Sequence, residues 1–272
     1  MKTEAQAEGD SGLADELARI EQIINSPEMR DVRRHRQGNG RVLRPRNAAT
    51  IIVVDDEGKE PKILMGRRNR SLTFMPGALV FPGGSVDRAD ATAPAADNLH
   101  PGTEARIVAN MRGRPSARRA HALGMAAIRE LAEESGLLIG RKGEVDSAHP
   151  ASSHPDWQDF RDANVVPAIG GLVLFARAIT PPGPPRRFDT WFFAARASEI
   201  AHRPEGGFRP SGELEALQWM TPGEAIGGPT REITRVMLVE LMRRMKRDPT
   251  LDPSHPAPFY RALRGQFHRE IM

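Results

Sequence analysis

Apolar residues recur at helical spacing near the start of the chain and then give way to strand-like runs. Within residues 12–26, four apolar side chains lie three or four positions apart: Leu13, Leu17, Ile20 and Ile24. This spacing predicts a helix with one buried face. The next segment, RDVRRHRQGNGRVLRPR, is crowded with charges and has no apolar period, which indicates a polar connector. We therefore expect a helical extension and a basic linker over residues 1–46.

The main domain begins where β-branched residues appear. From Ala48, the run ATIIVVDD, the turn EGKEP and the apolar run KILMGRR predict a β-hairpin. Proline and glycine then flank a short predicted strand from Ala78 to Phe81. Further along, VVPAIGGLVLFARAIT predicts a strand pair or one bent strand, and FDTWFFAARA and GELEALQWMTP predict two more strands.

Helical patterns alternate with these strands. GTEARIVANMR indicates a short helix, and PSARRAHALGMAAIRELAEESG a longer one with Pro115 near its start and Gly136 at the position of a C-terminal cap. PGEAI indicates the start of a helix, and PTREITRVMLVELMRRMKR has an amphipathic pattern. This alternation predicts an α/β (α+β) domain over residues 47–247, a mixed β-sheet sandwiched between helices. Residues 248–272 are rich in proline, and we expect a tail that packs on the surface or is mobile.

Composition narrows the chemistry. The chain has 272 residues, enough to bury a sizeable core, and it contains no cysteine. Disulfides, thiolate metal sites and cysteine nucleophiles are therefore excluded, and any metal must be held by oxygen or histidine. No apolar run is long enough to span a bilayer, and the N-terminus lacks the pattern of a signal peptide, so we expect a cytoplasmic protein without a membrane partner.

The charge is mildly basic. A net charge of +4 comes mostly from arginine, and it would attract nucleotides, cofactor phosphates or nucleic acid without choosing among them. A solvated, arginine-rich surface explains the same excess.

Three glutamates gather in the segment AAIRELAEESGLLIG. On a helix, Glu130, Glu133 and Glu134 share a face, while Ile128 and Leu131 point elsewhere, toward a core. The ordinary explanation for such glutamates is a solvated acidic face. However, like charges this close repel one another by roughly a few tenths of a kcal/mol per pair. A bound cation would relieve that repulsion, and several carboxylates are what Mg²⁺ or Mn²⁺ uses.

The surroundings favour the cation. Upstream, FPGGSVDRAD contains Gly83 and Gly84, which permit a backbone path close to a ligand. Arg129 can fix a carboxylate through its planar guanidinium. Gly136 ends the helix and completes a loop, helix, loop unit.

These residues resemble the Nudix box of the Nudix hydrolases. The second half of the box is complete: Arg129, Glu130, Leu131, Glu133, Glu134, Gly136 and Leu137. The first half is represented by Gly84 and by Asp90, where the family more often has glutamate. Between the two halves the family has a short spacer, whereas here residues 91–128 intervene. We therefore expect a Nudix domain with an insertion at about residues 91–120, which leaves the geometry of the glutamates unchanged.

The insertion is similar to that of a Nudix subgroup that includes the peroxisomal coenzyme A diphosphatases. A shorter signature of coenzyme A hydrolysis is matched by Gly77, Phe81, Pro82, Gly83 and Gly84. The signature also has an arginine where this chain has Thr73, so coenzyme A is a leading candidate and no more.

The resemblance implies a hydrolase that cleaves a nucleoside diphosphate linked to another group, with Mg²⁺ or Mn²⁺ as cofactor. Water attacks a phosphorus atom while a carboxylate accepts the proton, and Glu130 is the first choice of base. The catalytic residues implied are Glu130, Arg129 and Glu133. The metal ligands implied are Glu130, Glu133 and Glu134, with Glu213 added by analogy and Glu215 next. The substrate-binding residues implied are Gly83, Gly84, Arg67 and Asp90.

Several alternatives stay open. The substrate could instead be ADP-ribose, NADH, a dinucleoside polyphosphate or a capped RNA end, or the fold could serve as a non-catalytic nucleotide- or RNA-binding module. The intact glutamates argue against the module, so we expect a small-molecule nucleotide as partner, with nucleic acid disfavoured and the oligomeric state open, a homodimer included. The basic insertion forms either a lid over an anionic substrate or a solvated helix face. Phe188, Trp191 and Phe192 fit a core strand better than a platform for stacking a base.

Overall fold

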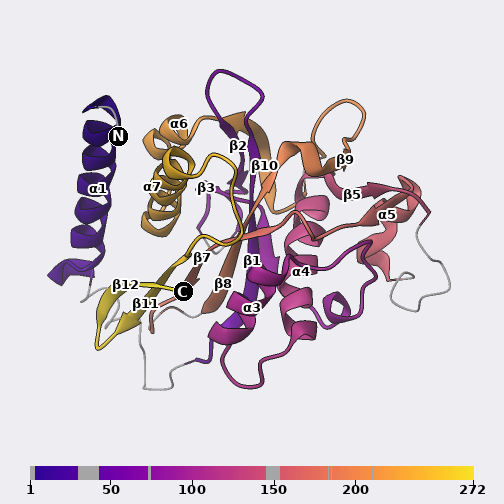
Figure 1. Cartoon of the computed structure of the whole chain (residues 1–272), viewed down its shortest axis with the longest axis horizontal. Coiled ribbons are helices and arrows are strands. Elements are labelled where there is room, and N and C mark those ends of the chain that lie inside the picture. The colour runs from indigo at the N-terminus through magenta and orange to yellow at the C-terminus, as the bar shows by residue number, and fades with distance from the viewer. Residues whose placement is uncertain are drawn as a thin grey trace.

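A computed structural model describes residues 4–29, 43–72, 75–144, 154–182, 184, 186–209 and 211–272 of the chain. One large mixed sheet forms its centre (Figure 1). Seven of its strands follow the order β10-β2-β1-β8-β7-β11-β12, while β3 pairs with β2 and β4 pairs with β1. The bounds of these strands are β1 Arg46–Asp55, β2 Lys62–Arg68, β3 Leu79–Val80, β4 Gly83–Ser85, β7 Val173–Ile179, β8 Phe188–Arg196, β10 Leu214–Met220, β11 Pro258–Leu263 and β12 Gln266–Ile271. The β1–β8 and β11–β7 pairs are parallel, and the other pairs are antiparallel.

The central strand β1 is buried on both faces, which explains its unbroken run of β-branched residues. Successive side chains of a strand point to opposite faces. Accordingly, Ile51 and Val53 belong to one hydrophobic core, and Ile52 and Val54 belong to another.

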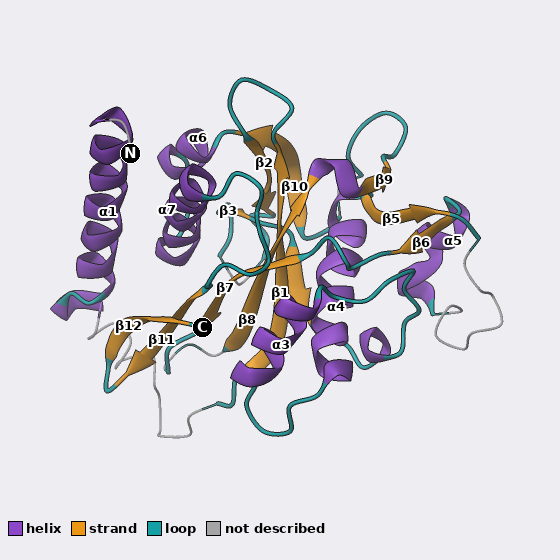
Figure 2. Cartoon of the chain, in the orientation of Figure 1, coloured by secondary structure: helices purple, strands orange, loops and turns teal. Residues whose placement is uncertain are grey.

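Helices cover both faces of the sheet (Figure 2). On one face lie α3 (Pro101–Asn110) and α4 (Ala117–Ser135), and on the other lie α1 (Glu4–Ile24), α6 (Pro222–Gly227) and α7 (Glu232–Arg247). The expected α/β architecture, a mixed sheet between helices, is therefore confirmed. No helix in the described part of the chain combines the length and apolar character that crossing a bilayer requires.

A second, smaller sheet lies beyond the end of α4. It has the order β6-β5-β9, with β5 at Leu138–Lys142, β6 at Val165–Pro167 and β9 at Ile200–His202. The short helix α5 (Gln158–Asp162) lies beside it. Because β5 begins just after the helix cap at Gly136, this small sheet anchors the C-terminal end of α4.

Most elements predicted from the sequence are present. The helix expected within residues 12–26 is confirmed, although α1 begins earlier, at Glu4, and the linker after it falls largely outside the described residues. The strand expected from Ala78 to Phe81 is shorter, and the pattern missed β4, β5 and β9.

The C-terminal end differs from the expected tail. Its strands β11 and β12 form an antiparallel hairpin, and β11 extends the main sheet by pairing with β7. Tyr260 of β11 is fully buried in the core beneath α7, so this segment belongs to the domain.

Candidate active site

Helix α4 carries the three glutamates and is closed by local signals at both ends. The Ser116 side chain caps the N-terminus by accepting from the backbone N–H of Arg119. At the other end Gly136 adopts a left-handed conformation, with φ of 76°, and its N–H donates to the carbonyl of Ala132. Ile128 and Leu131 are fully buried between these ends, and they fix the rotation of the helix.

The double glycine of β4 lies directly against two of the glutamates. A Cβ atom at Gly84 would lie 2.4 Å from the carboxylate of Glu130. The backbone N–H of Gly83 donates to Glu134 Oε2 at 2.9 Å. Glycine at both positions therefore brings the β4 backbone close to the carboxylate face of α4.

Arg129 links the two halves of the motif. Its Nε and Nη2 atoms donate to the two oxygens of Asp90 at 2.8 and 3.2 Å. Nη2 also donates to the carbonyl of Ser85, while Nη1 donates to Glu130 Oε1 at 2.9 Å and Glu133 Oε1 at 3.2 Å. One guanidinium thus holds β4, the loop after it and two glutamates in a fixed arrangement.

Asp90 is buried, whereas a side chain that contacts a substrate must be accessible to it. Its side chain is fully buried, and Oδ2 also accepts from the backbone N–H of Asp87 at 2.7 Å. Both oxygens therefore have partners within the protein. This placement favours a role in positioning Arg129 over direct contact with a substrate.

Burial raises the pKa values of all three glutamates. The pKa of Glu134 rises to about 8, because burial outweighs the hydrogen bond from Gly83. The pKa of Glu130 rises to about 7, again through burial, which the positive charge of Arg129 partly offsets. Burial also raises the pKa of Glu133, against the lowering effect of Arg129. A bound cation would favour the ionised form of these groups.

The donor atoms fit a hard divalent cation. Glu130 and Glu133 each use Oε1 for Arg129, and Glu134 uses Oε2 for Gly83, so each carboxylate keeps its second oxygen for another ligand. Within the described residues, however, no three acidic or histidine side chains are already grouped to hold a metal ion. Binding would therefore require small side-chain movements toward a shared ion.

The other predicted residues lie on the strands beside the site. Glu213, just before β10, forms an ion pair with Arg68 at 3.5 Å, and its charge contributes to the raised pKa of Glu134. Its side chain is 63% exposed. Arg67, on β2, donates to the carbonyl of Gly77 at 3.4 Å, so its side chain contacts the loop that precedes the double glycine. Thr73 lies outside the described residues.

One further acid was missed from the sequence. Asp156 lies in a short 3₁₀ helix, Pro155–Trp157, that packs against α4, and its charge adds to the raised pKa of Glu133. His154 Nδ1 lies 3.3 Å from a carboxylate oxygen of Asp156. Both residues lie in a loop with no regular pattern, so no sequence signal linked them to the glutamates.

The aromatic strand belongs to the core. Trp191 and Phe192 of β8 are buried, and Phe188 at its start is partly buried. The guanidinium of Arg177 lies 4.2 Å from the centre of the Trp191 ring. The core interpretation is therefore confirmed for Trp191 and Phe192.

Several arginines of the insertion bind backbone carbonyls of neighbouring loops. Arg106 donates to the carbonyls of Pro253 and Ser254, and Arg118 donates to the carbonyl of Ala91. Arg119 precedes Glu130 by about three helical turns, which is about 16 Å along the axis. These contacts place the basic part of the insertion away from the glutamates.

No protein-family model matches the chain. A Nudix hydrolase from Alicyclobacillus acidocaldarius, solved by crystallography, is 26% identical and has a TM-score of 0.52, with 72% of this chain and 90% of that chain covered. The chain has a Nudix fold.

The chain is also similar in sequence to a curated protein that is named as a Nudix hydrolase. A Caenorhabditis elegans protein, provisionally named nudix hydrolase 7, is 30% identical over 188 residues, which make up 66% of this chain. The match covers 53% of the relative, so the chain spans about half of its length. Both this relative and the A. acidocaldarius protein are named as Nudix hydrolases, so the similarity of the chain is to that family.

More distant Nudix structures say less. The Nudix domain of NrtR from Shewanella oneidensis, solved with ADP ribose, is 9% identical with a TM-score of 0.43, and it covers 75% of this chain and 90% of that chain. This likeness is too low to bear on the ligand of the present chain.

Proposed function

We propose that the chain is a Mg²⁺- or Mn²⁺-dependent Nudix pyrophosphohydrolase that cleaves the diphosphate linkage of a nucleoside diphosphate derivative. The observation that carries this proposal is the placement of Glu130 and Glu134 against the double glycine of β4. A carboxylate face beside exposed backbone suits an anionic diphosphate only if divalent cations lie between them. The family of the curated relative supports the same reaction.

In this proposal, Glu130, Glu133 and Glu134 would hold the metal, with Glu213, the residue just before β10, as an additional ligand. When bound, the metal neutralises the diphosphate oxygens and favours attack by water. The role of Arg129 is to hold the carboxylates of Glu130 and Glu133 in fixed positions, because Nη1 donates to both. Glu130 is the first choice of group to accept the proton from the attacking water, because its carboxylate lies directly against the double glycine of β4.

Gly83, Gly84 and Arg67 contact the substrate in this proposal. Gly84 leaves the β4 backbone open on the carboxylate side, where a side chain would otherwise collide with Glu130, and the N–H of Gly83 faces Glu134. Arg67 lies near the end of β2 and contacts Gly77, which belongs to the segment that resembles the coenzyme A signature. Coenzyme A or acyl-coenzyme A is therefore the first candidate substrate.

The test is a substrate panel with a matched variant. The full chain is incubated with Mg²⁺ or Mn²⁺ and coenzyme A, acyl-coenzyme A, ADP-ribose, NADH or diadenosine polyphosphates, and the products are identified by mass. We expect release of a nucleoside monophosphate or bisphosphate that stops with a chelator. Glu133→Gln should lower the rate about 100-fold or more, the effect of losing a transition-state interaction worth roughly 3 kcal/mol.

The control is Glu57→Gln, which removes an exposed glutamate from the turn between β1 and β2. It should keep wild-type activity. Equal rates for Glu133→Gln and the wild type would overturn the assignment of the site. Turnover of ADP-ribose or NADH without turnover of coenzyme A would keep the reaction and replace the substrate, whereas no turnover across the panel would reject the proposed activity.

A further inference from the structure

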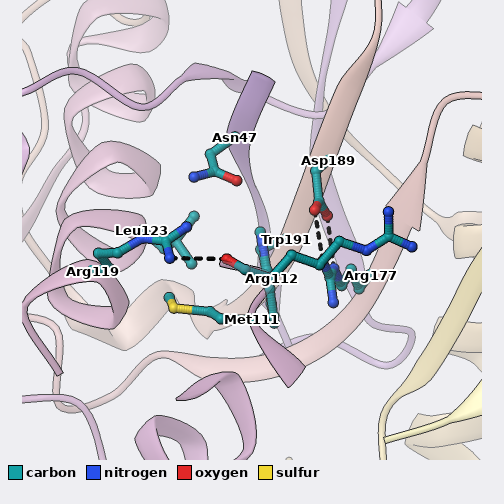
Figure 3. Close-up of a pocket in the computed structure, with 8 residues that line it drawn as sticks. All are labelled: Asn47, Met111, Arg112, Arg119, Leu123, Arg177, Asp189 and Trp191. Atoms are coloured by element: carbon teal, nitrogen blue, oxygen red, sulfur yellow. Dashed lines mark hydrogen bonds and ion pairs between the residues drawn. The ribbon is translucent and has the colours of Figure 1, made fainter. Parts of the chain in front are cut away.

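A small cavity opens where the insertion meets the main sheet (Figure 3). The loop between α3 and α4 contributes Met111 and Arg112, and α4 contributes Arg119 and Leu123. Strands β1, β7 and β8 supply the remaining walls: Asn47, Arg177, Asp189 and Trp191. Leu123 precedes Glu130 by about 10 Å along the axis of α4. The cavity is therefore separate from the carboxylate cluster.

The charges around this cavity do not balance. Its only carboxylate, Asp189, binds Arg177 through both oxygens at 2.7 and 2.6 Å. Nη1 of Arg119 donates to the backbone carbonyls of Arg112 and Arg114. Among the described residues, no carboxylate forms an ion pair with Arg112 or Arg119. Within the described part of the chain, these two guanidinium charges therefore have no anionic partner.

A neighbouring arginine adds to the positive potential. Arg187 donates through Nε to the carbonyl of Thr180 at 3.0 Å. Burial lowers the pKa of the Arg187 guanidinium, and the positive charge of Arg112 lowers it further. Like charges held this close are expected to attract an anion into the space between them.

We propose that this cavity binds a phosphate monoester group, carried by the substrate or supplied as free inorganic phosphate. Its volume of about 20 Å³ admits one water-sized group, so a tetrahedral oxyanion would insert one oxygen and keep the others at the mouth. Arg112 lines the cavity and is exposed, and its planar guanidinium suits paired phosphate oxygens. Leu123 and Trp191 form the apolar walls, which strengthen a charged contact by excluding water.

The first experiment measures phosphate binding without turnover. Thermal unfolding of the full chain is followed in metal-free buffer with increasing inorganic phosphate, and with chloride at the same ionic strength as the baseline. Without metal, phosphate has no cation through which to bind the glutamates. We expect phosphate to raise the Tm of the wild type, and Arg112→Ala to need about tenfold more phosphate for the same rise.

Arg118→Ala is the matched control. It removes the same charge from a position six residues further along the chain, at the start of α4, but Arg118 donates to the carbonyl of Ala91 and does not line the cavity. It should keep the phosphate response of the wild type. Arg112 is exposed, so its truncation should leave the packing intact. Equal responses in the wild type and Arg112→Ala, or no response in the wild type, would overturn the proposal.

The second experiment identifies the source of the phosphate, and it rests on the proposed function. Coenzyme A and dephospho-coenzyme A share one diphosphate linkage and differ by one phosphate monoester. If that group enters the cavity, Arg112→Ala lowers the kcat/KM for coenzyme A relative to dephospho-coenzyme A about tenfold. An unchanged ratio, together with the phosphate response above, assigns the cavity to free phosphate. Lack of turnover with both compounds would count against the proposed function and leave the melting result standing.

Discussion

At the scale of single residues, the two glycines of β4 have different roles. A Cβ atom at Gly83 would lie 2.5 Å from the Ala49 carbonyl oxygen and 2.6 Å from Thr50 Cα, and neither backbone atom can yield within the sheet. At Gly84 the three atoms nearest to an added Cβ all belong to the carboxylate of Glu130, which is the far end of a side chain and can rotate away. Gly83 is thus needed for folding, and Gly84 for the position of Glu130.

This contrast predicts opposite outcomes for two alanine variants. Gly83→Ala should destabilise the fold by about 2 kcal/mol or more, through the clash and its φ of 154°. Gly84→Ala should keep nearly the wild-type stability but lower kcat about 100-fold, because it displaces Glu130. Urea unfolding and steady-state kinetics measure the two effects separately. Full activity in Gly84→Ala would show that the position of Glu130 is unimportant.

The buried pair of Asp90 and Arg129 gives a second prediction at this scale. Removing Asp90 leaves a guanidinium that is only 4% exposed without its main partner. Asp90→Ala should therefore cost about 3–5 kcal/mol of folding free energy. It should also lower kcat, because Glu130 and Glu133 depend on Arg129. A substrate contact would instead raise KM and leave the urea midpoint unchanged, so the two measurements together distinguish the roles.

At the scale of elements, the buried glutamates of α4 make the stability of the folded chain depend on pH. In the metal-free folded chain, Glu130 and Glu134 hold protons up to pH values of about 7 and 8, whereas in the unfolded chain they lose them near 4.5. The folded state therefore binds more protons in this window. Its stability is fully present below pH 4.5 and falls as the pH rises to 8.

Divalent metal should reverse this trend. At pH 8, Mg²⁺ or Mn²⁺ should raise the Tm strongly, because the ion binds the deprotonated carboxylates, and at pH 5.5 the rise should be small. Glu134→Gln should flatten the metal-free profile by a few kcal/mol or less, since its amide cannot ionise. Melting curves from pH 5 to 8, with and without metal, check both points. A metal-free stability that increases with pH in the wild type relative to Glu134→Gln would contradict the burial argument.

Elements also show where sequence reasoning succeeds and fails. The helix that carries Glu130 was predictable, because Pro115, Gly136 and the apolar period between them are local signals. Strand β4 was not, because its three residues contain two glycines and no apolar side chain. The C-terminal hairpin was missed because β11 pairs with β7, a distant part of the chain, and proline obscured its pattern.

The candidate site follows the same rule. The mutual spacing of Glu130, Glu133 and Glu134 was readable because all three lie on one helix. The partnership of Asp90 with Arg129 was not, because the insertion separates them in the sequence and only the fold brings them to 2.8 Å. The approach of Asp156 likewise depends on a loop that packs against α4.

At the scale of the whole molecule, the sheet separates the candidate site from the N-terminal helix. Helix α1 packs against α7 on the side of the sheet opposite α4, and its Leu17, Ile20 and Ile24 belong to the same hydrophobic core as α7. The Asn25 side chain also donates to the Phe267 carbonyl and accepts from the Phe267 N–H. The helix thus covers the core of α7 and satisfies part of the edge strand β12.

This arrangement predicts that stability and catalysis can be separated by removing residues 1–26. The truncated chain would expose the apolar surface that Leu17 and Ile20 cover, and lose the Asn25 contacts that protect β12. We expect a lower Tm and concentration-dependent self-association in light scattering. The kcat per folded molecule should stay within about twofold of the full chain, because the glutamates of α4 pack on the other core. Ile20→Asp, which disrupts the same contact in the full-length chain, should reproduce the lower Tm. A folded, monomeric truncation that has lost its kcat would show instead that α1 acts on the site through the sheet.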